Sequence, residues 1–198
     1  MTTQLPWLDA PLRDALGMAR HHHALLIHGP AGVGQFELAL LLAQAWLCSA
    51  DAQQPCGACA DCRLVEARNH PDLRVLIPAA LRESLGWDGD EGDDAASNDS
   101  KASRAKPSKD IRVDAVRAAI ACAQRTSARG RCKVIGLYPA ERLNAVAANA
   151  LLKTLEEPPG DARFVLATGA PQALPATVRS RCQPLHLSVP PTALATVW

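Results

Sequence analysis

The stretch LLIHGPAGVGQFELALLLAQ, from Leu25 to Gln44, decides the fold class of this chain. A short apolar run leads into a glycine-rich turn and then into a long apolar segment. This order predicts a buried strand, a tight turn and a helix. Glycines let backbone N–H groups converge on an anion at a helix N-terminus. The stretch therefore predicts a phosphate-binding loop in an α/β protein.

The loop keeps its glycines but lacks the side chains that would bind a nucleotide. Gly29, Gly32 and Gly34 have the spacing of a phosphate-binding loop. A nucleotide-binding loop continues with Lys and then Ser or Thr, whereas this chain has Gln35 and Phe36. Loss of a phosphate contact and a magnesium ligand costs several kcal/mol, at about 1.5–3 kcal/mol each. We expect a degenerate loop without ATP binding, and an ordinary strand–turn–helix is the alternative.

The carboxylates of a nucleotide hydrolase are also missing. Such an enzyme needs a carboxylate pair at the end of the next core strand to hold magnesium and orient water. Here the predicted strand Lys133–Leu137 ends in Tyr138 and Pro139. Glu141 lies two residues farther on and cannot simply substitute. The sequence therefore predicts no intrinsic ATPase activity.

Strands and helices alternate along the rest of the chain. Strands are expected at Ala24–Ile27, Leu73–Ile77, Lys133–Leu137, Arg163–Ala167 and Pro184–Ser188, and helices at about 7–20, 36–47, 113–125 and 144–156. This alternation predicts a parallel sheet covered by helices on both faces. Ligands of such sheets bind at the carboxyl ends of the strands.

Composition limits the class of protein. Apolar residues make up 48% of the 198 residues, which indicates a folded chain. The formal net charge of +1 gives no overall basic field for nucleic acid. No run of about 18 apolar residues is present, so we expect a cytoplasmic protein. Residues 79–110 are rich in Gly, Asp, Ser and Lys and predict a flexible insertion.

Four cysteines form a compact cluster with the pattern C-x7-C-x2-C-x2-C. They are Cys48, Cys56, Cys59 and Cys62. This spacing suits a tetrahedral all-thiolate zinc site with a structural role. Free thiols, a redox pair and an iron–sulfur cluster are alternatives, and His70 is a rival ligand.

Two further motifs carry a resemblance to a known family. NALLKTLEEPP, from Asn149 to Pro159, and SRC, from Ser180 to Cys182, accompany the cysteine cluster and the glycine loop. Together they resemble the bacterial DNA polymerase III clamp-loader subunits of the AAA+ superfamily, over about residues 7–189. The resemblance implies an AAA+ P-loop-type core at 1–189, with a zinc module at 48–62. It also implies that a helical lid domain starts at 190–198, the remainder being absent.

The departures from this family resemble its non-hydrolysing members. The motor subunits, gamma and tau, have intact loops and an acidic pair, whereas this chain differs at Gln35, Phe36, Tyr138 and Pro139. In LATGAP, Gly169 also stands where a polar nucleotide-sensing side chain is expected. The resemblance thus implies a passive subunit of a complex that contains gamma or tau and delta. Through that complex it would meet the sliding clamp and primed DNA during replication.

The SRC motif implies a role in a neighbour's active site. By resemblance, Arg181 is an arginine finger acting in trans, with Ser180 and Cys182 holding its position. A fixed guanidinium stabilises charge on the transferring phosphoryl group, and such fingers change rates by about 10³–10⁵. Arg179 is the nearest rival, and a surface salt bridge is the structural alternative.

Other functions stay open on the residues alone. The chain could be an ATP-hydrolysing motor subunit despite Gln35. It could be a zinc-containing nucleic-acid-binding module that uses Arg63 and Arg68. It could also be a redox protein that uses its thiols.

Overall fold

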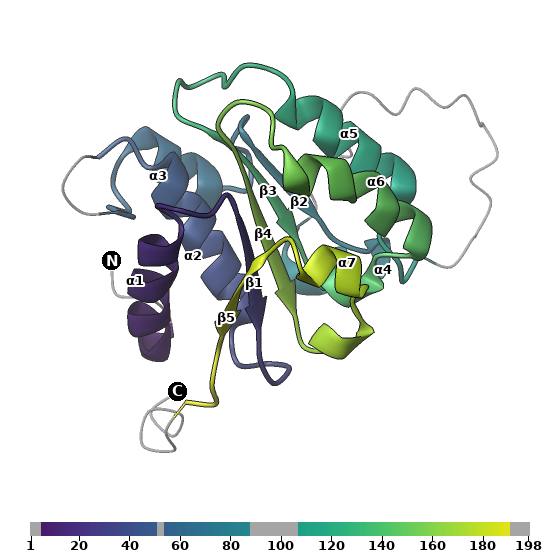
Figure 1. Ribbon diagram of the computed structural model, residues 1–198. Coiled ribbons are helices and arrows are strands. Elements are labelled where there is room, and N and C mark those ends of the chain that lie inside the picture. The colour runs from purple at the N-terminus through teal and green to yellow at the C-terminus, as the bar shows by residue number, and fades with distance from the viewer. Residues whose placement is uncertain (1–4, 51–53, 88–106, 191–198) are drawn as a thin grey trace.

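The computed structural model describes residues 5–50, 54–87 and 107–190, and it contains a five-stranded sheet (Figure 1). The strand order is β2-β3-β4-β1-β5 and every pair is parallel. The strands are β1 (Ala24–His28), β2 (Leu73–Leu76), β3 (Lys133–Leu137), β4 (Ala162–Thr168) and β5 (Gln183–His186). The predicted parallel sheet is confirmed, although β5 begins one residue before the predicted strand and ends two residues before its end.

Helices cover both faces of the sheet (Figure 1). The α-helices are α1 (Asp9–Met18), α2 (Gln35–Leu47), α3 (Ala60–Glu66), α4 (Ala79–Arg82), α5 (Val113–Ala123), α6 (Ala145–Glu156) and α7 (Ala176–Arg179). The 3-10 helices are η1 (Pro6–Leu8), η2 (Glu83–Leu85), η3 (Ala140–Arg142) and η4 (Pro171–Ala173). Helices α1, α2 and α3 pack on one face, and α5, α6 and α7 pack on the other.

Burial on both faces explains why the central strand β1 is apolar over most of its length. Along β1, Leu25 and Ile27 belong to the core under α2. Ala24 and Leu26 belong to the core under α5 and α6. Successive side chains of a strand point to opposite faces, so both sets must be apolar in a sheet covered twice.

The turn between β1 and α2 requires glycine. Gly34 has a φ of 103°, a left-handed conformation that side chains with a Cβ rarely adopt. A Cβ at this position would also lie 3.1 Å from Leu5 Cδ1. The N-terminal segment packs over the loop here, and the Trp7 indole N–H donates to the Val33 carbonyl oxygen at 2.9 Å. The loop is therefore fixed from outside by the residues around η1.

The predicted flexible insertion at 79–110 is wrong in its first part. Residues 79–85 form α4 and η2, and the Trp87 side chain is only 6% exposed. Trp87, Leu81 and Leu85 pack against the core under α2, although the segment is polar in composition. Residues 88–106 of the insertion and 191–198 of the predicted lid lie outside the described residues. Among the helices that the structure describes, none is long and apolar enough to cross a membrane.

Candidate functional site

Gln35 fills the interior of the glycine loop. It begins α2, and its side chain is 2% exposed. The amide Nε2 donates to the carbonyl oxygens of Gly29 at 3.0 Å and Pro30 at 2.5 Å. A phosphate-binding lysine would instead extend its charge towards the ligand. The Gln35 amide instead bridges two carbonyl groups of the loop by hydrogen bonds, and it presents no positive charge to an anion.

Phe36 and Tyr138 bring two predicted departures into direct contact. Phe36 is 4% exposed, and its ring centroid lies 5.0 Å from that of Tyr138, the residue that follows β3. Burial raises the pKa of the Tyr138 hydroxyl. In the pattern of a nucleotide-binding protein, Phe36 stands where Ser or Thr is expected and Tyr138 where a carboxylate is expected. Neither side chain supplies a ligand atom that suits magnesium.

Trp87 and Arg68 complete this aromatic cluster, and sequence reasoning missed both contacts. The Trp87 ring centroid lies 6.3 Å from that of Phe36 in an edge-to-face arrangement. The Arg68 guanidinium carbon lies 4.7 Å from the Trp87 ring centroid and 5.9 Å from that of Phe36. These are distances of cation–π interactions. The engagement of Arg68 with two rings counts against its use in a nucleic-acid-binding module.

A polar pair lies where the strands end beside the loop. Thr168 closes β4, is fully buried, and donates from Oγ1 to Glu141 Oε2 at 2.7 Å. The backbone N–H of Ala170 donates to the same hydroxyl at 3.0 Å. At the next position, a Cβ on Gly169 would lie 3.2 Å from the Cβ of Ala31. The polar group at this strand end is thus Thr168, which the sequence interpretation overlooked beside Gly169.

Arg181 follows α7 and is held on the surface by its own chain. Its Nε donates to Glu156 Oε1 at 2.7 Å, and Nη2 contacts the same oxygen. Nη1 donates to the Thr177 carbonyl oxygen at 2.7 Å. The Arg181 side chain remains 30% exposed. The structural alternative, a salt bridge within the chain, is therefore present, and it leaves part of the guanidinium accessible.

The neighbours of Arg181 fix the backbone around it. Ser180 donates from Oγ to the Thr177 carbonyl oxygen at 3.2 Å. Cys182 is buried, and burial raises the pKa of its thiol to about 12. Arg179, the rival residue, is exposed at the end of α7.

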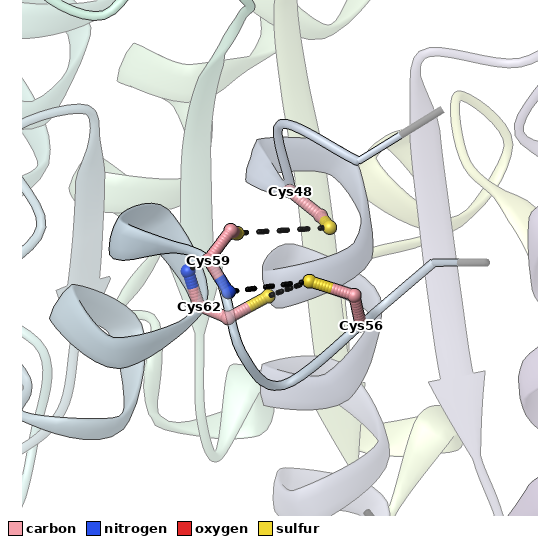
Figure 2. Close-up of side chains that lie close together, drawn as sticks. All are labelled: Cys48, Cys56, Cys59 and Cys62. Atoms are coloured by element: carbon pink, nitrogen blue, oxygen red, sulfur yellow. Dashed lines mark hydrogen bonds between the residues drawn. The ribbon is translucent and has the colours of Figure 1, made fainter. Parts of the chain in front are cut away.

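The four clustered cysteines converge from two helices and the segment between them (Figure 2). Cys48 caps the end of α2, and Cys59 and Cys62 lie at the start of α3. All four sulfur atoms lie within 4.8 Å of one another, and the Cys48–Cys59 and Cys56–Cys62 Sγ–Sγ distances are both 3.9 Å. A tetrahedral zinc site with Zn–S bonds of about 2.3 Å has sulfur atoms about 3.8 Å apart. The arrangement therefore fits a zinc ion.

Hydrogen bonds to sulfur favour the thiolate form in part of this cluster. The Cys59 N–H donates to Cys56 Sγ at 3.3 Å, and the Cys62 N–H donates to Cys59 Sγ at 3.4 Å. Burial alone would raise the pKa of Cys59, but hydrogen bonds from Ser49 and the Cys62 N–H lower it to about 5. Thiolates are the form of cysteine that binds metal ions.

His70 does not join the cysteines, so its role as a rival ligand is wrong. Its Nδ1 accepts the Asp72 N–H at 3.1 Å, and its Nε2 lies 3.4 Å from Asp61 Oδ1. Asp61, which stands between Cys59 and Cys62 in the sequence, also pairs with Arg129. The histidine and this ion pair connect the cysteine segment to the loop before β3.

Comparison with known proteins identifies relatives over nearly the whole chain. The family model described as "DNA polymerase III, delta subunit" matches residues 8–191. The DNA polymerase III subunit delta' of Yersinia pestis is 38% identical over 98% of this chain and 50% of its own length. The delta' subunit of Escherichia coli K12 is 36% identical over 98% of this chain and 51% of its own length. This chain thus spans about half the length of these relatives.

Related subunits and a solved structure extend the comparison. The DNA polymerase III subunit tau of Escherichia coli K12 is 36% identical over 89% of this chain and 23% of its own length. The crystal structure of a gamma subunit-related protein from Thermotoga maritima superposes with a TM-score of 0.60 at 20% identity. That match covers 92% of this chain and 47% of the other, and it supports an AAA+-type fold.

Proposed function

Because this chain belongs to the delta-prime family of DNA polymerase III subunits, we propose that it is a non-hydrolysing subunit of a clamp loader. In that complex, ATP hydrolysis by gamma or tau subunits drives the loading of a sliding clamp onto primed DNA. This subunit works beside gamma or tau and delta, and it meets the clamp and DNA through the assembly. Residues 1–189 belong to its AAA+-like core.

The contact between Phe36 and Tyr138 carries the proposal that the subunit does not hydrolyse ATP. Magnesium bridges the phosphates of ATP and neutralises charge as the reaction proceeds. The two ring positions close the place where its protein ligands would stand. Gln35 adds a second obstacle, since its amide is already bonded to the loop carbonyl groups and carries no charge. A triphosphate would find neither a metal ion nor a lysine in this loop.

Arg181 is the residue through which the subunit acts on its neighbour. Its guanidinium lies partly exposed after α7, on a backbone held by the buried Cys182. In an assembled complex it would reach the ATP of an adjacent gamma or tau subunit. A guanidinium fixed before the reaction stabilises charge on the phosphoryl group without reorganising.

Zinc has a structural role in this proposal. Cys48, Cys56, Cys59 and Cys62 would hold the ion and close its coordination shell, leaving no position for substrate. The ion would join the end of α2 to the start of α3. The ion would stabilise the segment between these two helices, and it would take no part in ATP hydrolysis.

The test is reconstitution of the full-length protein with its clamp-loader partners. Arg181→Ala should lower single-turnover ATP hydrolysis at the neighbouring site by about 10³-fold. Arg179→Ala is the matched control and should stay near the wild-type rate. Size-exclusion chromatography must show intact assembly for both variants. Unchanged hydrolysis in an intact Arg181→Ala complex would show that this arginine does not act in trans.

A further inference from the structure

Glu156 stands beside the proposed arginine finger, 25 residues away in the sequence. It is the last residue of α6, and its carboxylate takes two contacts from the guanidinium of Arg181, both through Oε1. The preceding Leu155 is 1% exposed, so the end of α6 is anchored in the core. On the other side, Val178 and Cys182 are buried around Arg181. Both partners of this ion pair therefore stand on fixed backbone.

The contacts divide the donors of the guanidinium into used and unused groups. An arginine side chain has five N–H donors in a planar fork. Glu156 takes the side edge made by Nε and Nη2, and the Thr177 carbonyl oxygen takes one N–H of Nη1 at 2.7 Å. Ser180 Oγ lies 3.5 Å from Nη1, at the limit of a hydrogen bond. Nη1 thus has two acceptors, whereas Nη2 has one, so one N–H of Nη2 is left over and can bind a phosphate oxygen.

We propose that Glu156 is a positioning residue that holds Arg181 with the unused N–H of Nη2 directed at the phosphate of a neighbouring subunit's ATP. This inference rests on the proposed function, since it assumes that Arg181 acts in trans. A free arginine side chain samples many rotamers, and most of them turn its unused N–H away from any given phosphate. The carboxylate of Glu156 removes that freedom before the neighbour binds. Glu156 itself does not touch the reacting atoms.

The experiment compares two substitutions at Glu156 in the reconstituted full-length complex. Glu156→Ala should lower kcat for ATP hydrolysis at the neighbouring site by about 10–100-fold, the cost of a misplaced catalytic group. The KM for ATP should stay within about 2-fold, because the residue orients Arg181 for the reaction and does not hold the nucleotide. Glu156→Gln keeps an acceptor oxygen in the same place and should recover most of the rate. Glu157→Ala, the adjacent carboxylate, should match wild type.

A double variant separates positioning from general stability. In an Arg181→Ala background, Glu156→Ala should cause no further loss, because the residue acts only through that arginine. If Glu156→Ala keeps or raises the rate while Arg181→Ala lowers it, the positioning role is wrong and the proposed function stands. If Arg181→Ala itself has no effect, the proposed function is wrong. Glu156→Ala could instead lower the rate equally in the wild-type and Arg181→Ala backgrounds and also lower the Tm. That result would overturn the positioning role in favour of a purely structural one.

Discussion

The ring centroid of Tyr138 lies 5.0 Å from that of Phe36, so the residue after β3 and the first turn of α2 are joined by an aromatic contact. Trp87 and Arg68 extend the contact to segments outside the loop. Packing interactions therefore stand where a nucleotide-binding loop is expected to carry metal ligands. Restoring ligands one at a time would remove a buried side chain without supplying the rest of the site.

This arrangement predicts that a repaired loop will be unstable and inactive. The double variant Gln35→Lys, Phe36→Ser should not hydrolyse ATP, because Tyr138 and Pro139 still offer no carboxylates. Loss of the buried ring should lower the free energy of unfolding by about 3–5 kcal/mol. Urea unfolding and ATPase assays of the full-length protein measure both effects. Val146→Ala, at a side chain that is 59% exposed, is the control and should change stability by less than about 0.5 kcal/mol.

Two observations together would refute the proposal that the ring contact blocks the nucleotide and stabilises the fold. The wild-type protein would bind magnesium–ATP at micromolar concentration in isothermal titration, and the repaired variant would keep its stability. In that case the ring contact would neither block the nucleotide nor support the fold.

The buried carboxylate of Asp72 should be a main electrostatic support of the fold. It accepts the backbone N–H groups of Ala128 and Arg129, and Lys133 Nζ donates to it at 2.9 Å. Asp72→Asn would leave the buried Lys133 ammonium unpaired and should cost about 3–5 kcal/mol. Asp114→Asn is the control, because its pair with Arg117 is exposed and should contribute less than about 1 kcal/mol. Similar unfolding curves for the two variants would contradict this prediction.

The same group predicts how stability depends on pH. Burial alone would raise the pKa of Asp72, but hydrogen bonds from Ala128, Lys133, Arg129 and Ser127 lower it below the ordinary value of 3.8. The unfolded state then binds the proton more readily than the folded state. Asp72 therefore contributes fully to the free energy of unfolding at pH values above 3.8. This contribution is lost as the pH falls below that value. Unfolding of wild type and Asp72→Asn between pH 6 and about 3 should show the gap between their stabilities narrowing only at the acid end.

The sequence predicted the centre of the sheet well because β1, β3 and β4 are buried along nearly their whole length. The run Lys133–Leu137, for example, matches β3 residue for residue. The cysteine cluster was also predictable, since Cys56, Cys59 and Cys62 are close in sequence and one helix end supplies Cys48. Such local patterns need no knowledge of distant contacts.

Features that depend on distant contacts were not predictable. The burial of Trp87 requires Phe36 and Arg68, which lie in other elements, so its polar surroundings predicted a loop. The partner of Arg181 comes from the end of another helix. The amide of Gln35 was read only as a missing charge, because its bonds to loop carbonyl groups depend on the folded turn.

Removal of one cysteine ligand tests the metal proposal. Cys59→Ser should reduce the zinc content of the full-length protein from about one ion per chain and lower its Tm, because a structural zinc site contributes directly to folding. Cys122→Ser is the matched control, since that cysteine lies in α5 outside the cluster. Elemental analysis and thermal unfolding give the two readouts. Unchanged zinc content and Tm in Cys59→Ser would exclude a structural ion at these thiols.

Gly29 makes the closest backbone approach in the loop, and it offers a test of the loop's rigidity. A Cβ at this position would lie 2.1 Å from the carbonyl oxygen of Leu187, just beyond β5. Because the obstacle is backbone, Gly29→Ala should force the loop and the chain after β5 apart and cost about 1–3 kcal/mol. Gly17→Ala in α1 is a control that should raise the free energy of unfolding. Nothing lies within 4 Å of its Cβ, and alanine should stabilise the helix by about 0.5–1 kcal/mol. Equal shifts for both variants in urea unfolding would show that the loop is not packed as tightly as these distances imply.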